Sequence, residues 1–213
     1  MNTLECFEPF YFQQKIRHNL VQKHEVLSVK KGVLNAAVAL VFRVQGGDIE
    51  LLFMQRAIHP NDPWSGHIAF PGGACEVEDQ HTLATALRET HEELGLNLTE
   101  SEWFGGLDYA YGPVIDQDKR VCLAPHVFLV KQNQSLILNE EAQDAFWIPI
   151  TRLVLQEHIR TFPHKELPNF TMYGIDLGIH SVPLLWGLTL RVLYDFFEKI
   201  ELKPEQNPLI FEE

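Results

Sequence analysis

The sequence predicts one α+β domain with a mixed sheet and a few helices, in a chain of 213 residues. Two apolar runs, Leu34–Val44 and Ile49–Arg56, flank the turn residues Gly46–Asp48, and this pattern is typical of a β-hairpin. Apolar residues recur at helical spacing over Thr82–Leu94 and predict a helix there. The strongly apolar C-terminal run Leu184–Leu202 predicts another helix.

The other expected elements are short. They are a helix within residues 12–28, a loop at His59–Ser65, a strand at Gly66–Phe70, strands near 103–111 and 120–131, a third strand near Leu136, and a loop that Phe146–Pro149 enters. The chain contains no internal repeat and no obvious linker. We therefore expect residues 1–213 to form a single domain, with residues 1–30 as an N-terminal extension.

Composition and charge exclude several classes of protein. Hydrophobic residues make up 46% and charged residues 22% of the chain, as in ordinary soluble domains. The net charge of −12 argues against a nonspecific nucleic-acid binder, which needs a basic face. A phosphate-bearing substrate is still compatible with this charge, because divalent cations can lie between two anionic partners.

The cysteines and the N-terminus bear on the compartment. Cys6, Cys75 and Cys122 lie far apart, which predicts free thiols in a reducing compartment rather than a disulfide framework or a zinc site. The N-terminus has no basic segment followed by an apolar run, and no stretch of the chain is apolar enough to span a membrane. We expect a cytoplasmic protein without a membrane partner.

The predicted helix over Thr82–Leu94 has two different faces. Because each helical residue turns by about 100°, Glu89, Glu92 and Glu93 should share one arc, opposite the apolar face. Like charges three and four residues apart destabilise a helix by about 0.2–0.5 kcal/mol per pair. A divalent cation would remove this cost, and ligands that are all oxygen suit Mg²⁺ or Mn²⁺. The alternative is an ordinary solvated face, in which Arg88 pairs with Glu92.

The loop before this helix strengthens the metal interpretation. Phe70–Gly73 ends a predicted strand with two glycines, which let the backbone turn sharply and bring a carbonyl close to a ligand. A short acidic loop with Glu76, Glu78 and Asp79 then leads into the helix. The combination of strand, paired glycines, acidic loop and R-E-x-x-E-E-x-G helix is far more specific than the three glutamates alone.

This stretch resembles the Nudix box, the signature of the Nudix hydrolase family. Its second half is matched by Arg88–Leu96, with Thr90 at a position that is usually apolar. The loop is one residue longer than the family pattern; allowing for this, Gly73 takes the glycine position and Asp79 the acidic position. The resemblance implies an α/β/α sandwich with a loop–helix–loop metal site that hydrolyses a diphosphate linkage.

The resemblance also implies roles for individual residues. Glu89, Glu92 and Glu93 should bind Mg²⁺ or Mn²⁺, with the Gly73 carbonyl as a further ligand, while Arg88 orients the glutamates by ion pairing. The general base stays open between Glu89 and Glu141. Glu141 lies in the loop before Trp147–Pro149, which matches a W-[IV]-P motif that often follows a functional glutamate in this family.

Two further segments resemble the coenzyme A pyrophosphatase branch of the family. They are Gly66–Gly73 (GHIAFPGG) and Trp186–Asp195 (WGLTLRVLYD). This branch cuts coenzyme A or its thioesters into adenosine 3′,5′-bisphosphate and a 4′-phosphopantetheine product. The preceding region departs from the branch: it is one residue longer, has Asn61-Asp62 near an expected Leu-Arg pair, and leaves Arg56 one position displaced.

Several alternatives therefore stay open. The substrate could instead be ADP-ribose, a nucleotide sugar or a dinucleotide, and the chain could be a nucleotide-binding module without activity. The candidate substrate-binding residues are Arg56, Trp64, Gly72 and Gly73. A homodimer is an expectation from the family alone, and Phe162–His180 could form a lid over the substrate. We interpret the WGLT helix and its aromatic residues as packing elements.

Overall fold

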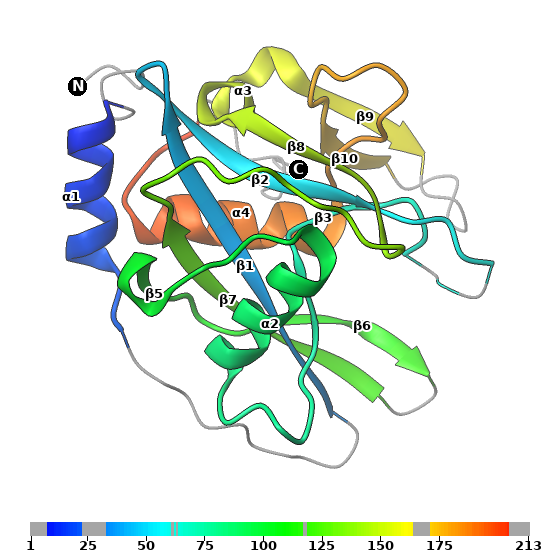
Figure 1. The fold of residues 1–213 in the computed structure, drawn as a ribbon. Coiled ribbons are helices and arrows are strands. Elements are labelled where there is room, and N and C mark those ends of the chain that lie inside the picture. Colours follow the sequence, from blue (N-terminus) through cyan, green and yellow to red (C-terminus); the bar gives the residue numbers. More distant parts are fainter. Residues whose placement is uncertain are drawn as a thin grey trace.

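The computed structural model describes residues 8–22, 33–60, 62, 64–116, 119–163 and 171–204 (Figure 1). Its helices are α1 (Pro9–Asn19), α2 (Thr82–Leu94), α3 (Ile150–Val154) and α4 (Gly187–Lys199), with short 3₁₀ turns at Glu100–Glu102 and Gln156–His158. Its strands are β1 (Val33–Gln45), β2 (Asp48–Arg56), β3 (Ile68–Ala69), β4 (Gly72–Ala74), β5 (Trp103–Gly106), β6 (Ala110–Asp116), β7 (Lys119–Leu129), β8 (Ala142–Pro149), β9 (Ile159–Pro163) and β10 (Thr171–Ile175).

The long strand β1 organises a mixed sheet. It pairs in parallel with β7, from Val33 opposite Arg120 to Phe42 opposite Leu129, and antiparallel with β2 and β4. The strand order is β3-β2-β1-β7-β5, with β8 added to β2 and β6 added to β7. The hairpin from β1 to β2 turns at Gly46-Gly47, as the sequence predicted.

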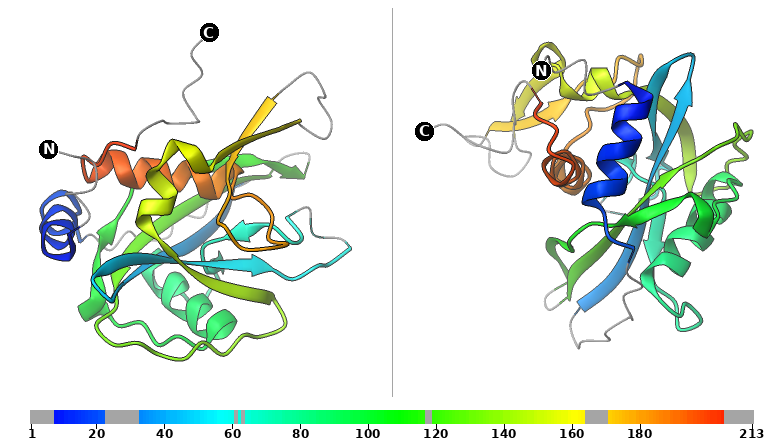
Figure 2. Two further views of the ribbon diagram at one scale, coloured as in Figure 1. Left: turned by 90° about the horizontal axis from the view of Figure 1, so that it is seen from above. Right: turned by 90° about the vertical axis from the view of Figure 1, so that its left-hand side faces the viewer.

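Helices cover both faces of this sheet, as both views in Figure 2 show. On β1, Val38, Leu40 and Phe42 face the cluster that contains α1 and α4. The alternate residues Ala37, Ala39 and Val41 face the cluster that contains α2. Because three small or β-branched residues line the second face, α2 can lie close to the sheet. The expected α/β/α sandwich with a mixed sheet is confirmed.

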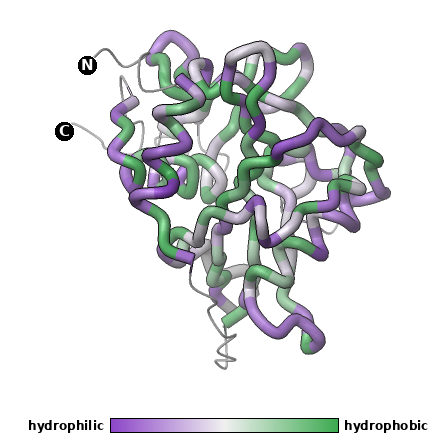
Figure 3. Tube along the Cα trace, turned by 60° about the vertical axis from the view of Figure 1, so that its left-hand side comes forward, coloured by the Kyte–Doolittle hydropathy of each residue, from purple (hydrophilic) through white to green (hydrophobic). Residues whose placement is uncertain are grey.

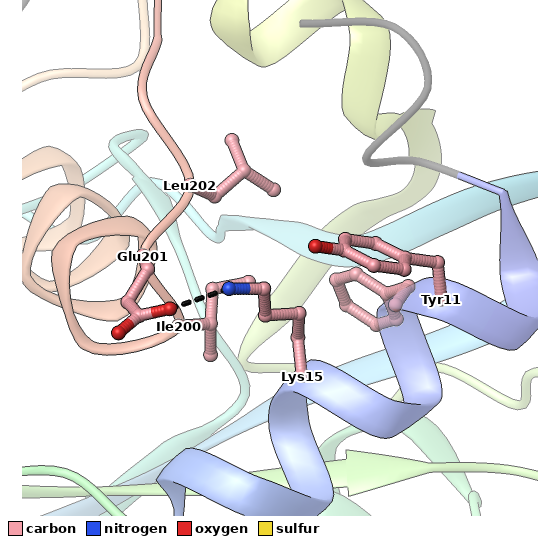
Figure 4. Close-up of a pocket in the computed structure, with 6 residues that line it drawn as sticks. Tyr11, Lys15, Ile200, Glu201 and Leu202 are labelled. Atoms are coloured by element: carbon pink, nitrogen blue, oxygen red, sulfur yellow. Dashed lines mark hydrogen bonds and ion pairs between the residues drawn. The ribbon is translucent and has the colours of Figure 1, made fainter. Parts of the chain in front are cut away.

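The N-terminal helix α1 is part of this packing. Phe12 and Ile16 are fully buried, and the Phe12 ring lies 5.1 Å from Phe42 of β1 and 6.2 Å from Phe196 of α4. Lys15 of α1 forms an ion pair at 2.5 Å with Glu201, which lies just after the end of α4 (Figure 4). The described part of the N-terminal extension therefore completes one helical layer of the domain.

The predicted N-terminal helix was misplaced. The observed helix α1 begins at Pro9, because proline suits the first turn of a helix, and it ends at Asn19. The prediction had placed the helix within residues 12–28. The chain then becomes extended, and Val21 forms an antiparallel bridge with Gly106 of β5. This pairing with the sheet ends the helix, and residues 23–28 of the prediction lie outside the described residues.

Three other boundaries also differ from the prediction. The expected strand near Leu136 is wrong, because the chain from Val130 to Asn139 is irregular. Phe146–Pro149 belongs to β8 instead of a loop, because β8 pairs with β2 along most of its length. The C-terminal helix begins at Gly187 rather than Leu184, because Leu185 is extended and bridges to Ile175 of β10.

Hydropathy follows the layers. Figure 3 shows hydrophobic stretches through the centre of the molecule and largely hydrophilic loops at its rim. Within the described ranges, no helix combines the length and the apolar character needed to cross a membrane.

The packing of α1 generates a test of stability. Phe12→Ala should lower the free energy of unfolding by about 3–5 kcal/mol, because it opens a cavity between α1, β1 and α4. Phe10→Ala, on the same helix with a side chain that is 76% exposed, should change it by less than about 0.5 kcal/mol. Urea unfolding of both variants checks this, and equal effects would contradict the position of α1.

Candidate active site

Two glycines bring the acidic helix against the edge of the sheet. Gly72 pairs with Val38 of β1, and a side-chain carbon at Gly72 would lie 2.2 Å from the carbonyl oxygen of Ala37. A side-chain carbon at Gly73 would lie 2.6 Å from the carboxylate of Glu89. Backbone atoms of β1 leave no room for a side chain at Gly72, whereas at Gly73 only the flexible end of the Glu89 side chain would have to move. The paired glycines therefore let β4 lie close to both β1 and the Glu89 carboxylate of α2.

Asp79 anchors the loop between β4 and α2. Its carboxylate accepts hydrogen bonds from Arg88 at 2.9 and 3.2 Å, from the Thr85 hydroxyl at 2.8 Å and from the Glu76 amide at 2.9 Å. Burial alone would raise the pKa of Asp79, but these hydrogen bonds outweigh it and the pKa is lowered. The carboxylate is therefore ionised at neutral pH and balances the charge of Arg88.

The extra residue lies after this anchor, because five residues separate Gly73 from Asp79, as in the family pattern, but eight rather than seven separate Asp79 from Arg88. A turn closes between the Glu76 carbonyl and the Asp79 amide, and its middle residues Val77 and Glu78 are exposed. This turn lies between Gly73 and Asp79, in the part of the loop that has the length of the family pattern. Asp79 and Gly73 lie at the two ends of the loop, as the realigned sequence pattern expects.

Arg88 holds several oxygen atoms together. Besides Asp79, it donates to Glu89 at 3.0 Å, to Glu92 at 3.0 Å and to the Ala74 carbonyl at 3.2 Å. The side chain of Glu92 is 51% exposed, whereas that of Glu89 is 14% exposed. One guanidinium thus links the loop and two of the three helix carboxylates.

Glu93 does not share the solvent-facing arc that the helical pattern predicted. It is only 1% exposed, because α2 packs against β4 on that side, and it accepts a hydrogen bond from the Gly72 amide at 2.8 Å. Burial raises the pKa of Glu93 to about 8, although the Gly72 bond opposes this and the charge of Glu89 adds to it. Without a bound cation, this carboxyl is largely protonated at neutral pH.

Glu141 lies at the end of β2, where its charge acts on two helix carboxylates despite its distance from them in sequence. The amide of Ala57, just after β2, donates to the Glu141 carbonyl at 2.8 Å. Burial raises the pKa of Glu89, and the charge of Glu141 contributes to the raised pKa of both Glu89 and Glu93. The three carboxylates therefore act on one another across the ends of β2 and α2.

These residues fit a hard divalent cation by their chemistry. Among the described residues, no three acidic, histidine or cysteine side chains are close enough in this conformation to share one ion. Arg88 draws Glu89 and Glu92 toward itself, and Glu93 is bonded to Gly72. Carboxylates that raise one another's pKa are nevertheless a donor set that a cation would stabilise, and oxygen donors suit Mg²⁺ or Mn²⁺.

The candidate substrate residues at the end of β2 have different surroundings. The charge of Arg56 lowers the pKa of Glu93, although burial of Glu93 outweighs this effect. It also donates to Asp62 at 2.7 and 3.2 Å, and Asp62 in turn accepts the Trp64 amide at 2.9 Å. The Trp64 side chain packs against the core cluster of α1 and α4.

The sequence interpretation missed the Arg56–Asp62 pair. It treated Asp62 only as a departure from a family motif, although an aspartate six residues after a strand-ending arginine, in a loop broken by prolines, is a recognisable partner. Asn61 lies outside the described residues.

The remaining histidines and aromatics have mainly structural surroundings. His81 caps α2 by accepting the Ala84 amide at 3.0 Å, and His91 is exposed on the helix flank. Tyr194 and Phe197 of α4 are buried, which confirms that this helix is largely a packing element. Trp186, at the N-terminus of α4, is only half-buried.

Comparison with known proteins agrees with this geometry. Residues 33–170 match the family model described as NUDIX domain. The human protein named mitochondrial coenzyme A diphosphatase NUDT8 is 32% identical over 158 residues, which cover 73% of this chain and 64% of that protein. The mouse protein of the same name is 32% identical, over 72% of each chain.

A solved structure shows the same fold. The crystal structure of a MutT/nudix family protein from Enterococcus faecalis superposes with a TM-score of 0.59 at 16% identity, covering 97% of this chain and 74% of that one. This likeness concerns the fold alone.

The burial of Glu93 predicts a pH dependence of stability in metal-free protein. Its pKa is about 8 in the folded chain and near the ordinary value of 4.5 when unfolded. The folded state therefore binds more protons between these values, and stability falls as pH rises through this window. Glu93→Gln should remove this part of the fall. Urea unfolding in a chelator at pH values from about 5 to 9 measures it, and parallel curves for both proteins would rule out the raised pKa.

Proposed function

This chain belongs to the NUDIX domain family, and from that premise we propose that it is a divalent-metal-dependent hydrolase of a diphosphate linkage in a nucleotide-like small molecule. The observation that carries the proposal is the placement of Glu89 and Glu93 against Gly73 and Gly72, where the charge of Glu141 also acts on both. Catalysis of phosphoryl transfer needs mainly positioning and charge neutralisation, and such a carboxylate cluster provides both once a cation is bound.

Glu89, Glu92 and Glu93, with the Gly73 carbonyl, would hold Mg²⁺ or Mn²⁺. Such an ion neutralises the diphosphate and lowers the pKa of an attacking water. Arg88 would act as a positioning residue, because its bonds to Asp79 and to the Ala74 carbonyl fix the guanidinium from which Glu89 and Glu92 are held. Metal binding would then require small movements of these two glutamates.

Two carboxylates can accept the proton of the attacking water. Glu89 lies half-enclosed between Gly73 and Arg88, whereas Glu141 is exposed and faces the helix carboxylates from the end of β2. We favour Glu141 as the base, because Glu89 is already bonded to Arg88 and is also needed as a metal ligand.

Coenzyme A or a thioester of it is the substrate that we propose. The GHIAFPGG and WGLTLRVLYD segments support this choice, as do relatives whose names include coenzyme A diphosphatase. Arg56, Trp64, Gly72 and Gly73 are the proposed substrate-binding residues. The Arg56–Asp62 pair argues for a pocket that differs in detail from the branch pattern. The alternatives are ADP-ribose, a nucleotide sugar or a dinucleotide.

Three further proposals follow from the sequence. The retention of all three helix glutamates favours an enzyme over a nucleotide-binding module without activity. A cytoplasmic location stays a prediction, since the names of the human and mouse relatives describe those proteins as mitochondrial. A homodimer also stays a prediction, and size-exclusion chromatography with light scattering would test it.

The metal ligands generate a kinetic test. Glu92→Gln and Glu93→Gln should each keep the fold and lower kcat by on the order of 100-fold or more, because a neutral amide binds a divalent cation poorly. Glu100→Gln, an exposed control outside the cluster, should keep the wild-type rate. Chelation should abolish turnover and Mn²⁺ should restore it. Near-wild-type rates in both cluster variants would disprove the metal assignment.

The proposed base has a neighbouring control. Glu141→Gln should lower kcat by about 10²–10⁴-fold, the range of general-base catalysis, and remove the acidic limb of the pH–rate profile. Glu140→Gln changes the adjacent exposed glutamate and should leave both unchanged. If Glu141→Gln kept the wild-type profile, the base would be Glu89.

A substrate panel tests the choice of substrate. With Mn²⁺, coenzyme A should yield adenosine 3′,5′-bisphosphate faster than ADP-ribose, NADH, diadenosine polyphosphates or nucleotide sugars are cut. Chromatography of the products checks this. Faster cleavage of another compound would reassign the substrate, and no turnover on any of them would favour the binding module.

A further inference from the structure

Three aromatic rings meet near the end of β2, and the proposed chemistry uses none of them. The rings of His67 and Trp186 lie 5.0 Å apart, and those of Trp186 and Phe162 lie 5.5 Å apart. They come from three different segments: the start of β3, the N-terminus of α4 and strand β9. None of the three is buried, unlike the aromatic residues of the core.

One member of the ring cluster, His67, and the proposed base Glu141 lie on opposite sides of the end of β2. The amide of Arg56 donates to the His67 carbonyl at 3.0 Å, so His67 is the neighbour of Arg56 on one side. Ala142 pairs with Arg56 on the other side, and Glu141 precedes it. Since neighbouring strands lie about 4.8 Å apart, the backbones at His67 and Glu141 are separated by about 10 Å.

The cluster is held rigidly in this place. The Thr189 hydroxyl donates to the Ile68 carbonyl at 3.2 Å and ties the start of α4 to β3. Leu185 pairs with Ile175 through two backbone hydrogen bonds of 2.9 Å, which tie the residue before Trp186 to β10. Burial lowers the pKa of His67, and although Asp62 opposes this effect, the ring is uncharged at neutral pH.

We propose that Trp186, flanked by His67 and Phe162, is the stacking wall for the nucleobase of the substrate. This inference rests on the proposed function, because it takes the carboxylates as the site of the diphosphate. An uncharged, half-exposed aromatic cluster favours a flat π-system over a phosphate or a sugar, and stacking tolerates any base. Arg56 and Asp62, paired between the wall and the carboxylates, add little net charge on this side.

This wall replaces Trp64 as the most suitable aromatic partner for a base. The Trp64 side chain packs against the core cluster, whereas the two rings that meet Trp186, those of His67 and Phe162, are only partly buried. The paired strands β9 and β10 also gain a role in substrate binding, because β9 carries Phe162 of the ring cluster.

Binding of AMP and of ribose 5-phosphate tests the wall, because these ligands differ only in the base. Calorimetry with Mn²⁺ should show that wild-type protein binds AMP at least about tenfold more tightly. Trp186→Ala should bring the two affinities within about threefold, while Trp186→Phe keeps most of the difference. Trp147→Ala is the control: this tryptophan is also half-buried but stacks on Arg43 at 4.2 Å, and its loss should preserve the AMP advantage.

Phe162→Ala provides a second variant if Trp186→Ala does not fold, and it should reduce the AMP advantage by severalfold. Equal binding of both ligands by wild-type protein would overturn the wall. An AMP advantage that survives both Trp186→Ala and Phe162→Ala would also overturn it. If AMP is favoured through Trp186 but no diphosphate is cut, the proposed function fails and the wall stands. If diphosphates are cut without any AMP advantage, the wall alone fails.

Discussion

A carboxylate buried against a backbone amide is the constraint on which the rest of this structure depends. Glu93 is 1% exposed and accepts a hydrogen bond from the Gly72 amide, and its pKa is raised to about 8, because burial of an ionised carboxylate is strongly unfavourable unless a partner compensates it. Placing Glu93 there requires α2 to lie close to β4, and β4 can pair closely with β1 because Gly72 has no side chain. The small residues Ala37 and Ala39 of β1 also let α2 lie close to the sheet. The fold therefore accepts a local cost at this position, and such a cost is typical of a functional site.

The two arginines near the helix carboxylates are each paired with an aspartate. Arg88 carries a positive charge that it shares between Glu89 and Glu92, and Asp79 also binds it through two hydrogen bonds. Arg56 is likewise held by Asp62. Both cations near the carboxylates are thus already paired with an aspartate, which leaves the gathered glutamates short of positive charge. A divalent cation would supply the missing positive charge. Its affinity would then depend on all the glutamates together rather than on any one of them.

Local patterns of the sequence were sufficient to predict the elements nearest the site. The wrong predictions arose where an element depends on pairing with a distant part of the chain. Helix α2 was predicted at its observed bounds, because apolar spacing and a following glycine define a helix without reference to the rest of the chain. The burial of Glu93 could not be predicted, since a helical projection gives the arc of a residue but not which neighbour covers it. β8 was missed for a similar reason: its identity depends on β2, nearly a hundred residues earlier in the chain. Asp79 was found by counting through the loop, whereas Asp62 needed the position of Arg56 in space.

The central claim is that the helix glutamates bind a divalent cation. Titration of metal-free protein with Mn²⁺, followed by the loss of free-ion signal in electron paramagnetic resonance, tests this claim most directly because it requires no substrate. The account predicts saturable binding to wild-type protein that Mg²⁺ competes away, and loss of this binding in a Glu89→Gln, Glu93→Gln double variant that remains folded. Equal Mn²⁺ binding by the double variant and the wild-type protein would contradict it.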